Sequence, residues 1–158
     1  MPSTHKKVIV HKVGRDSLNG YLSANFVVEG RLEMLNTAGN VVTIDLDEIK
    51  VVYFVRDFGD SGIPLRKTFA NRPRTEGLWV RLKFKDNDVI EGMMANDLTQ
   101  ARPEGFIINP PDTRSNVQRL FVPRSALSAL IVVGVIGTSG ARRRGLPADT
   151  RQVQLFEP

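Results

Sequence analysis

The stretch that decides the fold class is LWVRLKFKDNDVIEGMM, residues 78–94. Apolar side chains recur at every second position from Leu78 to Phe84, which is the period of a half-buried β-strand. Residues 86–88 are Asp-Asn-Asp, a combination that favours a turn, and a second apolar segment follows them. The stretch therefore predicts a β-hairpin.

The same hairpin pattern occurs earlier in the chain. Adding 72 to the numbers of residues 8–22 aligns them with residues 80–94 without a gap, and both copies have glycine at one register, as Gly20 and Gly92. Glycine inside a strand is expected where a sharp bend leaves no room for a side chain. The alternative interpretation is that the two glycines only end their strands.

A second offset extends the similarity beyond the hairpins. Adding 78 to the numbers of residues 42–52 aligns their apolar positions with residues 120–130, so the second copy contains six extra residues as the offset grows from 72 to 78. We place this insertion within residues 101–116, because turn-forming residues are frequent there and insertions belong in loops. These matches indicate an internal duplication.

Each copy spans about 55 residues and contains five strand-like segments without helical periodicity. We expect an all-β protein of two tandem small barrels, Sm-like or SH3-like, because closure of a small sheet removes exposed edges. Copies of this size are small for independent folding, so we also expect them to share an interface. The expected division of the chain is a first barrel in residues 6–56, a linker in 57–77, a second barrel in 78–133 and a flexible basic tail in 134–158.

Composition narrows the class of protein. The 158 residues are 41% hydrophobic and 25% charged, as in an ordinary globular protein, and they include no cysteine, which excludes disulfides and cysteine nucleophiles. The amino terminus lacks the apolar region of a secretion signal, and the longest apolar stretch, residues 126–137, is shorter than the roughly 20 residues that a membrane-spanning helix needs. We therefore expect a cytoplasmic protein with no membrane span.

Motifs for catalysis and for metal or cofactor binding are missing from the sequence. It contains no phosphate-binding loop, no dinucleotide fingerprint and no nucleophile elbow. His5 and His11 have no acidic residue at ligand spacing, and the acidic groups at residues 45–48 and 86–88 fall at predicted turns. We therefore expect no catalytic, cofactor-binding or metal-binding residues, and a protein that is not an enzyme.

Basic residues supply the only candidate interaction surface. The net charge is +5, and all of the excess lies in residues 58–158, which contain 15 basic and 10 acidic residues. Alternating basic residues on the predicted strand 78–85 are either its solvated outer face or a positive stripe that follows phosphates. The arginine triplet of the tail either solubilises the chain or contacts nucleic acid, acidic lipid or a partner. The candidate residues are Arg81, Lys83, Lys85, Arg102, Arg114, Arg119, Arg142, Arg143 and Arg144.

Three segments resemble a family of uncharacterised bacterial domains of unknown function. They are YFVRDF at residues 53–58, GFIINPPDTRSN at 105–116 and RLFVP at 119–123, and the resemblance spans residues 6–133. It implies a tandem β module of bacterial cytoplasmic proteins, in some cases beside signalling domains, and it supplies no catalytic motif.

A weaker similarity links residues 83–92 and 122–127 to the opening and closing strands of Sm-like domains, which bind single-stranded RNA. Such domains use an Asp and an Asn in one loop and an Arg-Gly pair in another. Asp97 lies where the loop Asp is expected, but no Asn follows it at the family's spacing, and no Arg-Gly pair occurs near Val122. The RNA pocket of the family is therefore not carried over.

Two functional hypotheses result. The first is a non-enzymatic bacterial interaction or regulatory module that binds a protein through barrel edges or loops. Its candidate surface is the linker, residues 57–77, together with the insertion at residues 102–119. The alternative is a nucleic-acid-binding, Sm-like and RNA-directed module that uses the basic strand and the arginine tail. Homo-oligomers are a further expectation, through edge strands or through the alternating terminal segment at residues 153–156.

Overall fold

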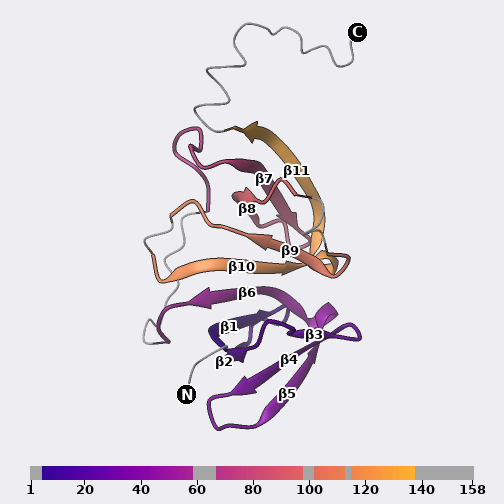
Figure 1. The fold of residues 1–158 in the computed structure, drawn as a ribbon. Coiled ribbons are helices and arrows are strands. Elements are labelled where there is room, and N and C mark those ends of the chain that lie inside the picture. Colours follow the sequence, from indigo (N-terminus) through magenta and orange to yellow (C-terminus); the bar gives the residue numbers. More distant parts are fainter. Residues whose placement is uncertain (1–4, 59–66, 98–101, 113–114, 138–158) are drawn as a thin grey trace, which may run out of the picture.

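The computed structural model describes residues 5–58, 67–97, 102–112 and 115–137, and in these residues all extended elements are β-strands (Figure 1). The prediction of an all-β protein is confirmed. No helix among the described residues is long and apolar enough to cross a membrane. The first half of the chain, up to residue 58, contains β1 (Lys6–Lys12), β2 (Ser17–Leu22), β3 (Val27–Val28), β4 (Arg31–Asn36), β5 (Val41–Asp45), the 3-10 turn η1 (Leu46–Glu48) and β6 (Ile49–Val55).

The second half, from residue 67 onward, has the same order of elements, except that its described residues contain no counterpart of β3. It contains β7 (Gly77–Phe84), β8 (Val89–Met94), β9 (Gly105–Ile108), β10 (Val117–Pro123), the 3-10 turn η3 (Arg124–Ala126) and β11 (Leu127–Ile136). The turns η1 and η3 differ by the offset of 78 at both ends. Of the predicted tail, residues 134–136 belong to β11, so the strand continues past the boundary predicted at residue 133. Residues 138–158, with Arg142, Arg143, Arg144 and residues 153–156, lie outside the described residues, as does Arg114.

The strands form two antiparallel sheets, not two closed barrels. One sheet has the order β3-β4-β2-β1-β6-β10-β9 with β5 attached to β4, and the other has the order β11-β7-β8. The prediction of two closed barrels is therefore wrong. The reason is that β6, which would have to pair with β5 to close the first barrel, pairs with β10 of the second half.

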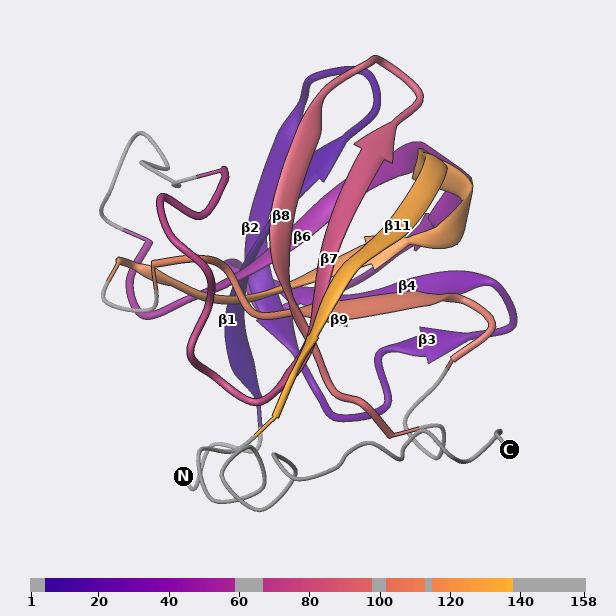
Figure 2. The same cartoon turned by 90° about the horizontal axis from the view of Figure 1, so that it is seen from above.

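The two halves are stacked on one another (Figure 1). Seen along the stacking direction, β8 follows the line of β2, and β9 follows the line of β4 (Figure 2). A bridge between Met93 and Asn109 connects β8 to β9, as the pairing of Gly20 with Asn36 connects β2 to β4. The contact between β8 and β9 thus matches the pairing of β2 with β4.

The matched glycines lie inside strands, at the closest approach of two chain segments. A Cβ atom on Gly20 would collide with the side chain of Met34 and would lie 2.6 Å from the carbonyl oxygen of Leu35. A Cβ atom on Gly92 would collide with Ile108 and would lie 2.6 Å from the carbonyl oxygen of Asn109. Crowding explains both glycines, and the interpretation that they only end strands is wrong.

The halves share their cores through the two central strands β1 and β6. Side chains on one face of these strands, among them Val10 and Val52, pack in the first half together with Phe121 from β10. Side chains on the other face pack in the core of the second half; these are Ile9, Val51 and Val55. The interface expected between the copies is therefore made by strand pairing and by shared burial.

Candidate functional site

A groove lies where the two halves meet, with a cavity of about 750 Å³. The amino-terminal end of β1, the loop after β2 and the strand β6 form its first wall. The opposite wall comes from β9, β10 and the segments beside them. The described lining residues include Lys6, Phe26, Phe54, Leu78, Met94, Asp97, Arg102, Phe106, Ile107, Arg119 and Arg124.

Three arginines of the groove are stacked on phenylalanine rings. The guanidinium carbon of Arg102 lies 5.4 Å from the ring centroid of Phe26, and that of Arg119 lies 5.1 Å from the centroid of Phe54. Arg124 lies 4.9 Å from the centroid of Phe106, and its Nε donates a hydrogen bond of 3.0 Å to the carbonyl oxygen of Pro103. Such cation–π contacts hold a guanidinium by its face.

Most of the guanidinium N–H groups of the three arginines are available for a ligand, since among the described residues only Nε of Arg124 donates a hydrogen bond. Guanidinium N–H groups lie in the plane of the group, so a ring beneath the face does not use them. None of the three arginines forms an ion pair within the part of the chain that the structure describes. The arrangement presents several fixed hydrogen-bond donors to the same cavity, a geometry that suits carboxylate or phosphate groups.

The charge of the groove is positive. Four basic residues, the three arginines and Lys6, line it, whereas Asp97 is the one acidic residue among its described lining residues. A positive cleft with apolar walls concentrates anions. The apolar part of the lining comes from Leu78, Met94 and Ile107, so the groove combines positive charge with an apolar surface.

The predicted basic stripe lies elsewhere, on the outer face of β7 and on the turn after it. Arg81, Lys83 and Lys85 are exposed, and they alternate with the buried Val80, Leu82 and Phe84. They do not line the groove. The structure thus brings the candidates Arg102 and Arg119 together and separates them from the stripe.

Arg81 is neutralised by a partner within the chain. Its Nη2 and Nε donate hydrogen bonds of 2.9 and 3.1 Å to Oε2 of Glu91, which is only 5% exposed. The backbone N–H of Phe69 donates to Oε1 of Glu91 at 2.9 Å. Burial raises the pKa of Glu91, but the hydrogen bonds from Phe69 and Arg81 outweigh it and hold this pKa below its usual value.

The acidic turns also have partners. Asp86 accepts a hydrogen bond from the N–H of Asp88, as expected of a turn, and both carboxylates accept from Nζ of Lys50 in the first half, at 2.9 and 3.0 Å. Asp88 accepts a further hydrogen bond from Nζ of Lys67 at 2.9 Å. These ion pairs fasten the first half to the β7–β8 turn.

A metal site is not formed where the structure describes the chain. No group of three or more His, Cys, Asp or Glu residues lies close enough there to hold a metal ion. His11 lies edge-on against the ring of Tyr53, with the ring centroids 4.8 Å apart. Burial and the charge of Lys50 lower the pKa of His11.

Sequence reasoning missed Lys6, Arg124 and the three phenylalanines of the groove. Arg124 directly follows Pro123 in a segment that the repeat alignment covers, but nothing in the pattern links it to Phe106. Lys6 and Arg119 are 113 positions apart and meet only because β6 pairs with β10. No local sequence pattern therefore places these residues at one site; only the pairing of the strands does.

Comparison with known proteins identifies a family and no individual relative. No curated protein and no solved structure matches the chain. One protein family matches residues 4–134, which is most of the chain, and it agrees with the predicted membership of an uncharacterised family. The chain belongs to this family, which is described as a family of unknown function, DUF6982.

Proposed function

We propose that the protein is a non-enzymatic interaction module whose groove binds an acidic, partly apolar segment of a protein partner. The observation that carries the proposal is the set of three guanidinium groups, those of Arg102, Arg119 and Arg124, each stacked on a phenylalanine at the same cavity. Arginine held in this way loses little side-chain entropy when it binds a carboxylate.

The size and the lining of the groove support a peptide segment as its occupant. A cavity of about 750 Å³ lies within the range of about 300–1,000 Å³ that is common for binding sites. The arginines supply donors for carboxylates, and Leu78, Met94 and Ile107 supply an apolar surface for a neighbouring side chain. A segment that alternates acidic and apolar residues matches both.

Nucleic acid fits the same groove less well. Binding of single strands usually needs an exposed aromatic face on which a base can stack. Phe26 and Phe54 are each only 5% exposed, and the guanidinium groups of Arg102 and Arg119 lie over them. On the outer face of β7, the ion pair with Glu91 removes Arg81 from the stripe and leaves Lys83 and Lys85.

The lining of the groove also favours binding over catalysis. Arginine stays protonated in proteins and is a poor general acid or base. The groove offers its ligand charge and shape, and this is the basis for proposing an interaction module.

We also infer that the two halves arose by duplication. The repeated element order, the 3-10 turns at an offset of 78 and the equivalent crowding at Gly20 and Gly92 support this origin. The connections account for the six extra residues, because β8–β9 is two residues longer than β2–β4, and β9–β10 is four residues longer than β4–β5.

The test is a fluorescence-anisotropy titration with a labelled peptide of alternating glutamate and leucine. The double variant Arg102→Ala/Arg119→Ala should weaken binding by about tenfold or more, since each arginine contributes charge-assisted hydrogen bonds. The matched control is Lys83→Ala/Lys85→Ala, which removes as much charge outside the groove and should leave binding within about twofold at moderate salt.

Random single-stranded RNA and duplex DNA are titrated in the same buffer. If RNA or DNA binds more tightly than the peptide, and the lysine variant abolishes that binding, the proposal is wrong and the nucleic-acid alternative holds. Equal loss of peptide binding in both double variants would also contradict the proposal, because it would mean nonspecific attraction by net charge.

A further inference from the structure

We call the pairing of β6 with β10 the joint between the two halves. Its two strands are not counterparts of each other in the repeat. The register pairs Phe54 with Arg119, Tyr53 with Leu120 and Val52 with Phe121. Strand β6 ends the first half, whereas β10 is the fourth long strand of the second half. The joint is therefore a head-to-tail contact, which uses one surface of the first half and a different surface of the second.

A head-to-tail joint leaves one complementary edge free at each end of the molecule. Within the described residues, β5 pairs only with β4, and β11 pairs only with β7. These two strands lie at opposite ends of the stack, β5 at the bottom and β11 at the top of Figure 1. One chain therefore cannot pair its own β5 with its own β11.

The free edges are the counterparts of the joint. The offset of 78 places β5 on β10 and places β6 on the first seven residues of β11. Phe54 and Tyr53, which face β10 in the joint, correspond to Val132 and Ile131. Phe54 is 5% exposed, whereas Val132 and Ile131 are 50% and 48% exposed.

The edge of β5 is apolar in the same way. Val41 at its start is 72% exposed, and it corresponds to Arg119 of the joint. Natural proteins protect exposed edge strands with charges, with proline or with covering segments. The exposed valine at the start of β5 and the exposed isoleucine and valine of β11 are instead typical of a surface that pairs.

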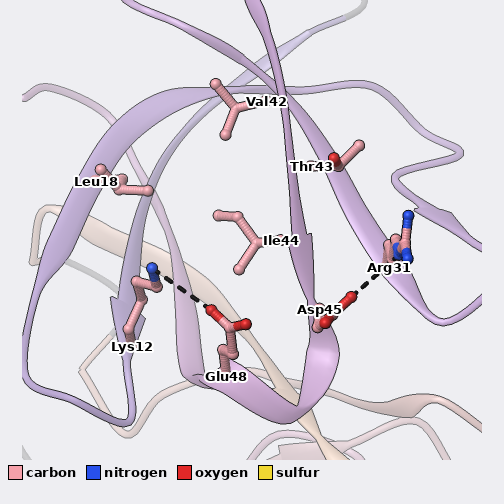
Figure 3. A pocket seen from close by; sticks show the side chains of 8 residues that line it. All are labelled: Lys12, Leu18, Arg31, Val42, Thr43, Ile44, Asp45 and Glu48. Carbon is pink, nitrogen blue, oxygen red and sulfur yellow. Dashed lines mark hydrogen bonds and ion pairs between the residues drawn. The ribbon is translucent and has the colours of Figure 1, made fainter.

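A cavity of about 300 Å³ beside β5 gives an independent indication (Figure 3). We call it the socket. It is lined by Leu18, Val42 and Ile44, and its rim carries the ion pairs of Lys12 with Glu48, at 3.6 Å, and of Arg31 with Asp45, at 3.1 Å.

At the equivalent place in the described part of the second half, the side chains are buried. The counterparts of the three apolar socket residues are Ile90, Leu120 and Val122, and all three are buried in one cluster. Ile9, Val51 and Val55 of the first half belong to the same cluster. The residues that line the socket in the first half therefore correspond to residues of the second half that are covered by side chains of the first half.

We propose that β11 of one chain pairs antiparallel with β5 of a second copy, repeating the joint between molecules. The register of the joint then places Ile131 opposite Val42 and Val132 opposite Val41 of the second copy. Ala129 and Val133, the counterparts of Val51 and Val55, face the socket. Because the two halves of one chain are stacked with similar strand directions, repetition of the joint extends the stack along the same axis (Figure 2).

Charge is compatible with this contact but makes it weaker than the joint. Arg81 and Lys83 stand where the joint has Ile9 and His11, so fewer apolar side chains are buried. Lys83 carries a charge opposite to that of Asp45 and Glu48 in the socket lining, whereas Arg81 is already paired with Glu91. We expect reversible association in the range of about 1–100 µM.

The test uses two substitutions at exposed positions, one on each edge of the full chain. Val41→Glu breaks the β5 edge and keeps β11 intact, whereas Val132→Glu breaks the β11 edge and keeps β5 intact. Because the register places these two positions opposite one another, the two glutamates repel and the broken edges do not pair with each other. In sedimentation equilibrium, the unsubstituted protein should exceed the mass of a dimer as its concentration rises, and each variant alone should stay monomeric. Circular dichroism and thermal unfolding establish that both variants are folded.

An equimolar mixture of the two variants is the deciding sample. It retains one intact β11 edge and one intact β5 edge on different chains, so it should form a heterodimer that grows no further. A symmetric contact predicts otherwise, since one variant alone would still dimerise. The proposal is overturned if either variant alone dimerises, if the mixture stays monomeric, or if the unsubstituted protein stays monomeric up to about 500 µM.

Discussion

The outer faces of β1 and β7, two strands at equivalent positions in the two halves, differ in charge and in burial. β1 presents Ile9 and His11 on this face, and it is covered by the second half. β7 presents Arg81 and Lys83 at the same positions, and it is exposed. One strand pattern thus carries an apolar or a charged outer face, depending on whether another half covers it.

The comparison bears on the two interpretations of the basic stripe. Alternating basic residues on a strand are compatible with a phosphate-binding surface, but they are also what remains when a covered face becomes a solvated one. The groove, in contrast, exists only because two halves meet. Its chemistry therefore depends on the joint and not on either half alone.

Substitution at the joint should have the largest effect on stability. Phe54 is buried in the core and supports Arg119, whereas its counterpart Val132 is half exposed. Phe54→Ala should lower the free energy of unfolding by about 3–4 kcal/mol, and Val132→Ala by less than about 0.5 kcal/mol. Urea unfolding at a low protein concentration measures both, and similar losses in the two variants would contradict the comparison.

Substitution of the matched glycines, Gly20 and Gly92, should have the second largest effect on stability. Gly92→Ala forces a methyl group against the carbonyl oxygen of Asn109 and should cost about 2–3 kcal/mol of stability. Gly20→Ala should behave similarly because of the carbonyl oxygen of Leu35. Gly14→Ala is the control, since no atom lies within 4 Å of the added methyl group. If all three variants unfold at the same urea concentration, crowding is not the reason for the glycines.

The buried carboxylate of the second half gives a pH-dependent prediction. Glu91→Gln weakens the ion pair with Arg81 and should cost about 2 kcal/mol at neutral pH, less than a fully buried pair because Arg81 is partly exposed. The pKa of Glu91 is lower in the folded protein than in the unfolded chain, so its contribution is present at neutral pH and is lost as the pH falls through this lowered value.

The difference in stability between the wild type and Glu91→Gln should therefore shrink in acid. Denaturant titrations at a series of pH values measure it. A difference that is constant from neutral pH down to acid unfolding would show that Glu91 does not contribute through its charge.

The smallest effect concerns Tyr53 at the joint. Burial raises the pKa of Tyr53 to about 12, above its value in the unfolded chain. The contribution of the neutral Tyr53 side chain to the free energy of unfolding is complete below the unfolded pKa of about 10. It is lost as the pH rises toward 12, and about 1 kcal/mol of it is lost by pH 11. Tyr53→Phe should not show this loss, and a counterpart variant, Ile131→Phe, should leave the alkaline profile of the wild type unchanged.

The sequence allowed prediction of the strands but not of their partners. Alternation located the β7–β8 hairpin, the offsets located its counterpart, and Gly20 and Gly92 marked the closest approach of chain segments. The run VVYF at residues 51–54 is apolar without interruption, which is typical of a strand buried on both faces. Periodicity does not identify the strand that covers the second face, so the pairing of β6 with β10 could not be predicted from the sequence.

The groove could be predicted only in part, for the same reason. Arg102 and Arg119 were candidates because they lie in and beside the basic insertion of the second copy. Their stacking partners Phe26 and Phe54 belong to the first half and are more than 60 positions away in the chain. A local pattern carries no information on contacts of that kind.

The most direct test of the central claim, that the joint creates the binding site, is a chemical-shift titration of isotope-labelled protein with the peptide of alternating glutamate and leucine. The account predicts that the perturbed amides cluster at the groove, around Phe54, Arg102, Phe106 and Arg119, with no change on the outer face of β7. Shifts concentrated at Lys83 and Lys85, with the groove unaffected, would contradict it.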